Sequence, residues 1–433
     1  MGCAIIIALP IIFCLWALWP KGSQSSHEAN ESYKTHEPHK SYEPYKSHWS
    51  HEPHRPHRPH RSHTPLPLSQ LFRNVAPLDT ANISVEVYDL TCATILFSRN
   101  ADRLAPPASC MKLLTAITAM QFLGTDHQFT SQVLATGQRE GGTLHGSLLF
   151  VLEDDPMLES LSPLADAVRR AGITSIDSAL VLSLMRNDTL KAHPTAATWD
   201  IPYNKLPILL KGRERIIREL HPLLSFLSAS EFTDMPHDET RLTPDADTIY
   251  SHQTSLTDVL IPMLTNSSNI KADALFSHIA QVCNRFPCVS LTPEEYLRCM
   301  VAMVDGHRPD FVLNDGSGLS PENRLTAHFL VQLLRYAWER EDMRHILIDQ
   351  ALATPGHPTR HGSLLGRMTA PLYRDRVFVK TGTLTSRGLS SLAGYIHSND
   401  DHWFIFSIIN ENSPVAESRM FQDRLCNALL STP

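Results

Sequence analysis

The chain has 433 residues, of which 42% are hydrophobic and 19% charged, and its net charge is -7 at pH 7. This composition is that of a globular protein and excludes a wholly disordered chain. The acidic balance argues against nucleic acid as a partner, because nucleic-acid-binding proteins concentrate positive charge. None of the 8 cysteines stands in a C-x-x-C pair, which argues against a zinc ribbon or a thioredoxin-type site.

An uncharged apolar run at residues 3–20 is just long enough to cross a bilayer. Residues 1–20 therefore predict a signal peptide or a membrane anchor. Both alternatives indicate export, either into the periplasm or to the outer face of the inner membrane. We expect the protein to meet a membrane only through this segment.

Residues 21–66 form a His/Pro-rich tract of low complexity. The tract lacks the aliphatic residues that build a core, so we expect a disordered linker. Imidazoles at this density bind zinc, nickel or copper weakly. We interpret the tract as a spacer with incidental metal affinity.

The globular part of the sequence shows strand patterns near both of its ends. Residues 82–90 alternate apolar and polar side chains, which predicts a half-buried strand, and residues 93–100 complete a hairpin with it. Residues 389–397 and 402–410 predict a second hairpin. Residues 417–430 have the spacing of an amphipathic helix. We therefore expect an α/β (α+β) fold in which both chain ends form one sheet and helices fill the stretch between them.

The first candidate catalytic motif is S-x-x-K, in which Ser109 precedes a helix-forming apolar run and Lys112 follows three residues later. This spacing places both side chains on one helix face. A neutral lysine amine within hydrogen-bond reach can accept the proton of the serine hydroxyl. Alone the motif is weak, because a serine before a helix is more often only a cap.

The second motif is K-T-G in residues 377–383, which we predict to be a strand. Lys380 offers a cation to a carboxylate, and Thr381 offers a hydroxyl. Gly382 has no side chain, so a substrate could lie close against the strand edge. We expect the backbone N–H of Thr383 to form an oxyanion hole with that of Ser109. The alternative is an edge strand with a solvated lysine.

The third motif is S-x-N, formed by Ser267 and Asn269 just before an amphipathic segment. A loop here could present a hydroxyl and an amide to one cavity. Ser267 would then relay a proton to the leaving amine, and Asn269 would bind the substrate backbone. Alone the pattern is usually a turn or a cap.

The set of three motifs in this order is specific, and with it the sequence resembles the penicillin-binding proteins. More narrowly it resembles the class-C low-molecular-mass D-alanyl-D-alanine carboxypeptidases, whose D-G-S-G-L-S signature is matched at residues 315–320. The resemblance implies a serine β-lactamase/transpeptidase-like sheet flanked by helices. We assign residues 67–125 and 251–433 to this catalytic domain and residues 126–250 to an inserted, shortened accessory domain.

Two departures from the family pattern leave the third residue of the stem peptide undetermined. The family often has an arginine after D-G-S-G-L-S, and this chain has Pro321 there. The family's partner aspartate follows a tryptophan in the insert, and this chain offers Asp200 at a different offset. The resemblance nevertheless implies a serine D-Ala-D-Ala carboxypeptidase or endopeptidase that acts on peptidoglycan stem peptides, is acylated by β-lactams, and needs neither metal nor cofactor.

Two other functions remain open at this stage. A serine β-lactamase shares the three motifs, but we find no glutamate motif for rapid deacylation. A non-catalytic protein that binds peptidoglycan or penicillin would also carry the fold. It would release no D-alanine.

Overall fold

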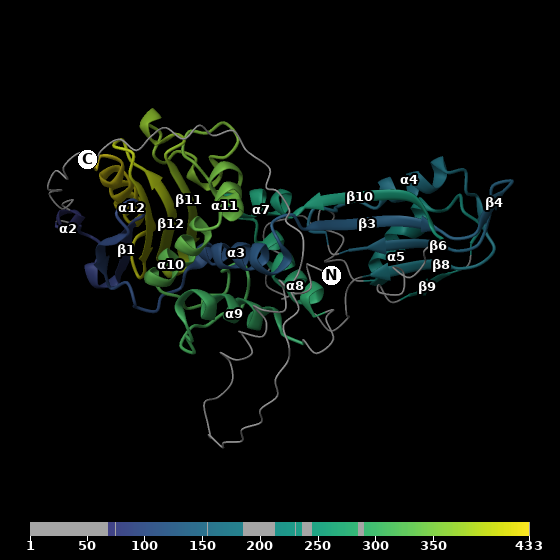
Figure 1. Cartoon of the computed structure of the whole chain (residues 1–433), viewed down its shortest axis with the longest axis horizontal. Coiled ribbons are helices and arrows are strands. Elements are labelled where there is room, and N and C mark those ends of the chain that lie inside the picture. Colours follow the sequence, from purple (N-terminus) through teal and green to yellow (C-terminus); the bar gives the residue numbers. More distant parts are fainter. Residues whose placement is uncertain are drawn as a thin grey trace, which may run out of the picture.

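The computed structural model describes residues 68–73, 75–153, 155–184, 213–229, 231–235, 245–284 and 290–432. These residues form two main sheets, each packed with helices (Figure 1). The predicted N-terminal segment, the His/Pro-rich tract and Asp200 lie outside the described residues. No helix among the described residues combines the length and the apolar character that a membrane crossing requires.

The first sheet is assembled from both ends of the described chain, as predicted. Its strand order is β11-β12-β13-β1-β2, and every neighbouring pair is antiparallel. Both predicted hairpins, β1 with β2 and β12 with β13, are confirmed. The strands are β1 (Ile83–Asp89), β2 (Thr94–Arg99), β11 (Val377–Leu384), β12 (Leu389–His397) and β13 (Trp403–Asn410).

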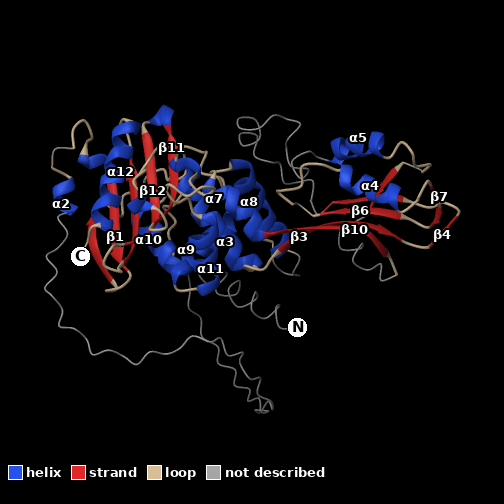
Figure 2. Cartoon of the chain, turned by 90° about the horizontal axis from the view of Figure 1, so that it is seen from above, coloured by secondary structure: helices blue, strands red, loops and turns tan. Residues whose placement is uncertain are grey.

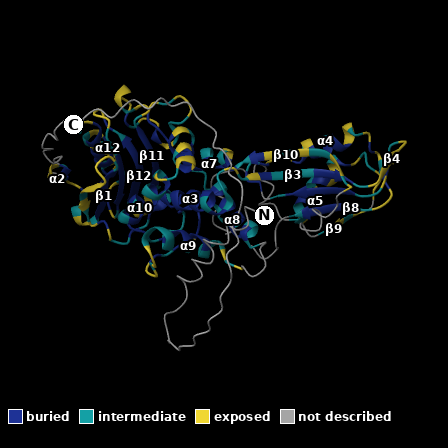
Figure 3. Cartoon of the chain, in the orientation of Figure 1, coloured by how far each residue is buried: buried dark blue, intermediate teal, exposed yellow. Residues whose placement is uncertain are grey.

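Helices cover both faces of this sheet, and the prediction of a half-buried β1 is therefore wrong: the whole strand is buried (Figure 3). Val85 and Val87 pack in the same core as helix α12 (Val415–Leu430). The opposite face of β1 meets α10 (Ala327–Trp338), where Glu86 lies 2.9 Å from the Nδ1 atom of His328. The polar residue Glu86 on β1 is therefore explained by its buried contact with His328, and not by exposure to solvent.

A helical layer adjoins the first sheet, with α3 (Met111–Leu123) at its centre. Almost every residue of α3 is buried, because neighbouring helices and the sheet surround it. A helix that is apolar on all sides is expected to lie inside a protein. The other helices of this part are α2 (Leu68–Leu71), α7 (Leu256–Thr265), α8 (Asn269–Cys283), α9 (Pro293–Asp305) and α11 (Glu341–His345).

The second main sheet has the strand order β10-β3-β6-β8-β9 and carries α4 (Ser162–Arg170) and α5 (Arg213–Leu223) on its apolar face. Its strands are β3 (Gln128–Ala135), β6 (Leu148–Leu152), β8 (Leu180–Leu184), β9 (Phe232–Asp234) and β10 (Asp247–Ser255). A small sheet of β4 (Gln138–Glu140), β5 (Thr143–His145) and β7 (Ser175–Ile176) lies at its far end (Figure 1).

Two paired strands carry the chain between the two parts. The chain leaves α3 for β3 and returns through β10 into α7, and β3 and β10 run side by side (Figure 2). The loop after β6 also contacts the helical layer, where Lys271 of α8 donates to the carbonyl oxygen of Pro156 at 3.1 Å. The boundaries assigned to an inserted domain stay a prediction.

We predict that packing of α12 on the sheet carries much of the stability of the first part. Phe421 is fully buried, and the Phe421→Ala variant should lose roughly 3–5 kcal/mol of unfolding free energy because a cavity remains. Met420 is 64% exposed, so Met420→Ala should change stability by less than about 0.5 kcal/mol. Chemical denaturation of both variants measures this, and equal effects would contradict it.

Candidate active site

Ser109 lies in a tight turn that leads directly into α3, as the sequence predicts. Residues Ala108–Cys110 form a 3-10 turn, and α3 begins at Met111. Ala108 has a φ of 46°, a left-handed conformation that is uncommon for a residue with a side chain. The turn is held because the hydroxyl of Ser391 on β12 donates to the carbonyl oxygen of Pro107 at 2.7 Å. Such backbone strain often marks a functional residue.

The amine of Lys112 is completely buried and contacts Ser109. Its Nζ atom lies 3.0 Å from the Oγ atom of Ser109, 2.7 Å from Oδ1 of Asn269 and 2.6 Å from the carbonyl oxygen of Ser317. The two carbonyl oxygens only accept hydrogen bonds, so they occupy two N–H groups. In a neutral amine the remaining position is a lone pair. This lone pair faces the hydroxyl of Ser109, which is the only one of the three partners that can donate a proton.

The surroundings of Lys112 favour this neutral form. Burial, reinforced by the positive charge of Lys380, lowers the pKa of Lys112 to about 7, while Asp273 and Asp315 oppose the shift. A lysine in water has a pKa near 10.4. The amine of Lys112 can therefore be deprotonated near neutral pH, as a general base requires.

The S-x-N segment comes to the same place as the S-x-x-K motif. Asn269 is the first residue of α8, and the side chain of Ser268 caps that helix by accepting from the N–H of Lys271. Ser267 is half-buried in the preceding turn, with a φ of 62°. In the structure the side chain of Asn269 contacts the amine of Lys112. The sequence predicted only that Asn269 would bind the substrate backbone.

Strand β11 forms one edge of the first sheet, and Lys380 on it is buried rather than solvated. The Nζ atom of Lys380 donates to the carbonyl oxygen of Thr381 at 2.7 Å, and burial lowers the pKa of Lys380 to about 8. Val379 bonds to Ala353 on the side of β11 away from β12. Alternate residues share a direction along a strand, so the backbone N–H groups of Thr381 and Thr383 point to this same outer edge.

Gly382 lies in close contact with the turn that carries Ser109, a packing role that the prediction did not include. A Cβ atom at Gly382 would lie 2.2 Å from Oγ of Ser391 and 2.9 Å from the backbone nitrogen of Ser109. The missing side chain therefore lets the turn that carries Ser109 pack against β11. This packing also brings the neighbouring Thr383 next to the turn that carries Ser109.

The loop that carries the D-G-S-G-L-S sequence wraps around the start of α3. The carboxylate of Asp315 accepts from the backbone N–H groups of Gly318 and Ser320, both at 2.6 Å. Gly318 has a φ of 78°, and a Cβ atom there would overlap the carbonyl oxygen of Ala108. The loop thereby places the Ser317 carbonyl on Lys112.

Asp273 is an acidic residue whose importance the sequence did not reveal. Its carboxylate oxygens are buried and make no hydrogen bond of normal geometry. The hydroxyl of Ser317 and the backbone N–H of Gly316 lie next to them. Burial and the charge of Asp315 raise the pKa of Asp273 to about 7, and Lys112 opposes the shift. The helical spacing was the available signal, because Asp273 lies one turn after Asn269 on α8.

Two further side chains meet the threonines of β11, and sequence patterns gave no sign of them. Ser363 and Thr381 share a hydrogen bond of 2.6 Å between their hydroxyl groups. Arg419, from α12, donates to the hydroxyl of Thr383 at 3.1 Å. A positive charge and several hydroxyl groups therefore adjoin the outer edge of β11.

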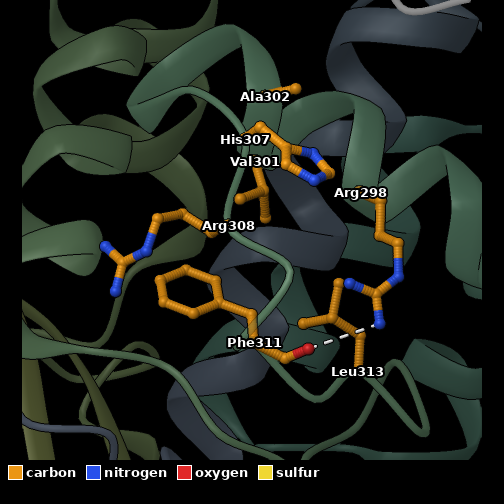
Figure 4. Close-up of a pocket in the computed structure, with 7 residues that line it drawn as sticks. All are labelled: Arg298, Val301, Ala302, His307, Arg308, Phe311 and Leu313. Atoms are coloured by element: carbon orange, nitrogen blue, oxygen red, sulfur yellow. Dashed lines mark hydrogen bonds between the residues drawn. The ribbon is translucent and has the colours of Figure 1, made fainter. Parts of the chain in front are cut away.

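The pocket drawn in Figure 4 is separate from this constellation, for it lies between α9 and the chain that follows. It contains two arginines, but Arg298 pairs with Glu294, and Arg308 pairs with Asp305 and Asp310. None of the motif residues lines it. The motif residues therefore meet outside this pocket, around Ser109.

A family model described as the D-Ala-D-Ala carboxypeptidase 3 (S13) family matches residues 67–204 and 238–429. A D-alanyl-D-alanine carboxypeptidase of Actinomadura sp. (strain R39) is 31% identical over 170 residues, which are 38% of this chain. This match spans only 30% of the length of the Actinomadura protein.

Two solved structures share the fold. Penicillin binding protein 4 from Haemophilus influenzae, complexed with a β-lactam, has a TM-score of 0.62 at 20% identity, over 84% of this chain and 99% of that one. A predatory peptidoglycan endopeptidase from Bdellovibrio bacteriovorus has a TM-score of 0.56 at 15% identity, over 81% of this chain and 92% of that one. The chain therefore belongs to the D-Ala-D-Ala carboxypeptidase 3 (S13) family.

Proposed function

We propose that the protein is a serine D-alanyl-D-alanine carboxypeptidase or endopeptidase that acts on peptidoglycan stem peptides through an acyl-enzyme on Ser109. The observation that carries this proposal is the contact of the buried Lys112 amine with the Ser109 hydroxyl. Family membership supports the reaction class. No feature of the site favours a merely binding role, because a buried lysine aimed at a serine is costly and serves no recognition.

The first half of the reaction uses the groups around α3. Lys112 accepts the proton of Ser109 as the hydroxyl oxygen attacks the carbonyl carbon of the penultimate D-alanine. The backbone N–H groups of Ser109 and Thr383 stabilise the negative charge that develops on the carbonyl oxygen. Ser267 relays a proton to the leaving amine, and the peptide bond breaks to release the terminal residue. Water then hydrolyses the ester on Ser109.

The second set of groups recognises the substrate. Its terminal carboxylate lies along the outer edge of β11, where the hydroxyl groups of Thr381 and Thr383 donate to it. The positive charges of Lys380, which lies against the carbonyl of Thr381, and of Arg419 on α12 attract this carboxylate. A β-lactam carries a carboxylate and a reactive carbonyl in a similar relation, so it should acylate Ser109 as well.

The Ser109→Ala variant, compared with the parent protein, tests the acyl-enzyme directly. Intact-mass measurement of the protein with benzylpenicillin should show a stable adduct, and the Ser109→Ala variant should show none. D-alanine release from a stem pentapeptide should fall at least about a thousandfold in that variant. A lasting adduct without D-alanine release would favour a binding protein, and rapid penicillin turnover would favour a β-lactamase.

The pH dependence of acylation should reflect Lys112. The neutral amine exists above its pKa of about 7, so the acylation rate should fall as the pH drops below about 7. The negative charge of Asp273 raises the pKa of Lys112, so Asp273→Asn should move the midpoint to lower pH. Stopped-flow acylation rates measure both effects.

The control for this pH prediction is Asp349→Asn, which removes an exposed carboxylate that is paired with His345. It should leave the midpoint unchanged. A midpoint that rises in Asp273→Asn would show that Asp273 does not act on Lys112 through its charge.

We further propose that the protein is exported and works in the periplasm or at the outer face of the inner membrane. The apolar run at residues 3–20 and a peptidoglycan substrate both support this location. Cell fractionation after osmotic shock should release the protein if the segment is cleaved, and leave it with the membrane if the segment is an anchor. Recovery with the cytoplasm would contradict export.

A further inference from the structure

A cluster of three possible metal ligands lies at the end of the first sheet. Asp89 is the last residue of β1, Cys92 stands in the turn from β1 to β2, and His402 directly precedes β13. One ligand atom from each residue lies within 4.8 Å of the other two. Three segments of the fold therefore converge on one point.

Asp89 is held in place before any ion binds. Its Oδ1 atom accepts from the backbone N–H groups of Thr91 and Cys92, at 2.8 and 2.9 Å. Its Oδ2 atom lies 3.2 Å from Nδ1 of His402, and the side chain is only 5% exposed. The backbone N–H of His402 donates to Ser398, which fixes the turn between β12 and β13.

The donor set has the chemistry of a zinc site. A thiolate, an imidazole and a carboxylate are the three side-chain types that bind Zn²⁺, whereas magnesium and calcium prefer oxygen alone. Ligand atoms at about 2.0–2.1 Å from a tetrahedral ion lie roughly 3.3 Å apart, close to the spacing of Asp89 and His402. Asp89 interacts with both the imidazole of His402 and the thiol of Cys92, so all three donor groups already converge on one point.

We propose that Asp89, Cys92 and His402 bind Zn²⁺. Cys92 is exposed, so a water molecule or another solvent-borne ligand completes the tetrahedron. The ion would join the turn between β1 and β2 to the turn between β12 and β13. Asp89 pairs with Phe404 of β13 and Ser391 pairs with Ile409, so the two rows lie five residue steps, or roughly 16 Å, apart along that strand. The ion therefore stabilises the sheet rather than taking part in the reaction.

Total zinc uptake cannot test this site, because the histidines of residues 21–66 also bind metal. Cys92 provides a local readout, since the other described cysteines are buried. Peptide mass spectrometry of the full-length protein can follow alkylation of Cys92 by iodoacetamide with and without zinc chloride. Saturating zinc should slow this reaction roughly tenfold or more, because a metal-bound thiolate is not free to attack.

The matched variants are His402→Gln and His397→Gln. His397 belongs to the same hairpin and pairs with Asp401, outside the cluster. Zinc should protect Cys92 in His397→Gln as in the parent, but not in His402→Gln. Cobalt should likewise give a thiolate-to-metal absorption band in the parent and in His397→Gln alone.

Circular dichroism checks that each variant is folded. If His402→Gln does not fold, Asp89→Asn answers the same question, because it keeps one carbonyl oxygen and removes the charge. Absence of zinc protection in the parent, or equal protection in a folded cluster variant, would overturn the proposal.

Discussion

The rest of the site depends on one buried amine, that of Lys112. Removing a lysine from water is costly unless every polar contact is replaced, and three segments provide the replacements. Ser109 comes from the turn before α3, Asn269 from the start of α8, and Ser317 from the loop after α9. These segments must converge for Lys112 to be buried at all, so the need to satisfy one amine fixes the geometry of the nucleophile.

Close packing of backbone holds this arrangement in register. Gly318 and Gly382 both lie against the turn that carries Ser109, and each would approach its atoms too closely if it carried a side chain. Ala108 accepts a left-handed conformation between them. The cost of that conformation is offset by the contacts of the turn with β12 and with the loop at residues 315–320. The reactive serine is therefore positioned by rigid neighbours rather than by its own short turn.

The second sheet is tied to the helix that carries Asn269. Lys271 reaches the carbonyl of Pro156, and the neighbouring Asp155 is buried and accepts from Thr254 at 2.6 Å. Met157 packs against the same core as α3 and α8. These contacts fasten the loop after β6 to the catalytic helices, so movement of the second sheet would act on α8 directly.

The sequence by itself determined the local elements and predicted the candidate reactive groups. The strand period at residues 82–90, the hairpin at residues 389–410 and the serine before a helix are short-range patterns, and each is encoded within a few residues. They predicted the sheet built from both chain ends. Only the tertiary structure decided that β1 is buried on both faces, that Lys380 is shielded from solvent, and that Gly382 serves packing. It also brought Asp273 and the Ser317 carbonyl to Lys112. These properties depend on contacts between residues far apart in the chain, and no local pattern records which distant side chain will cover a given face.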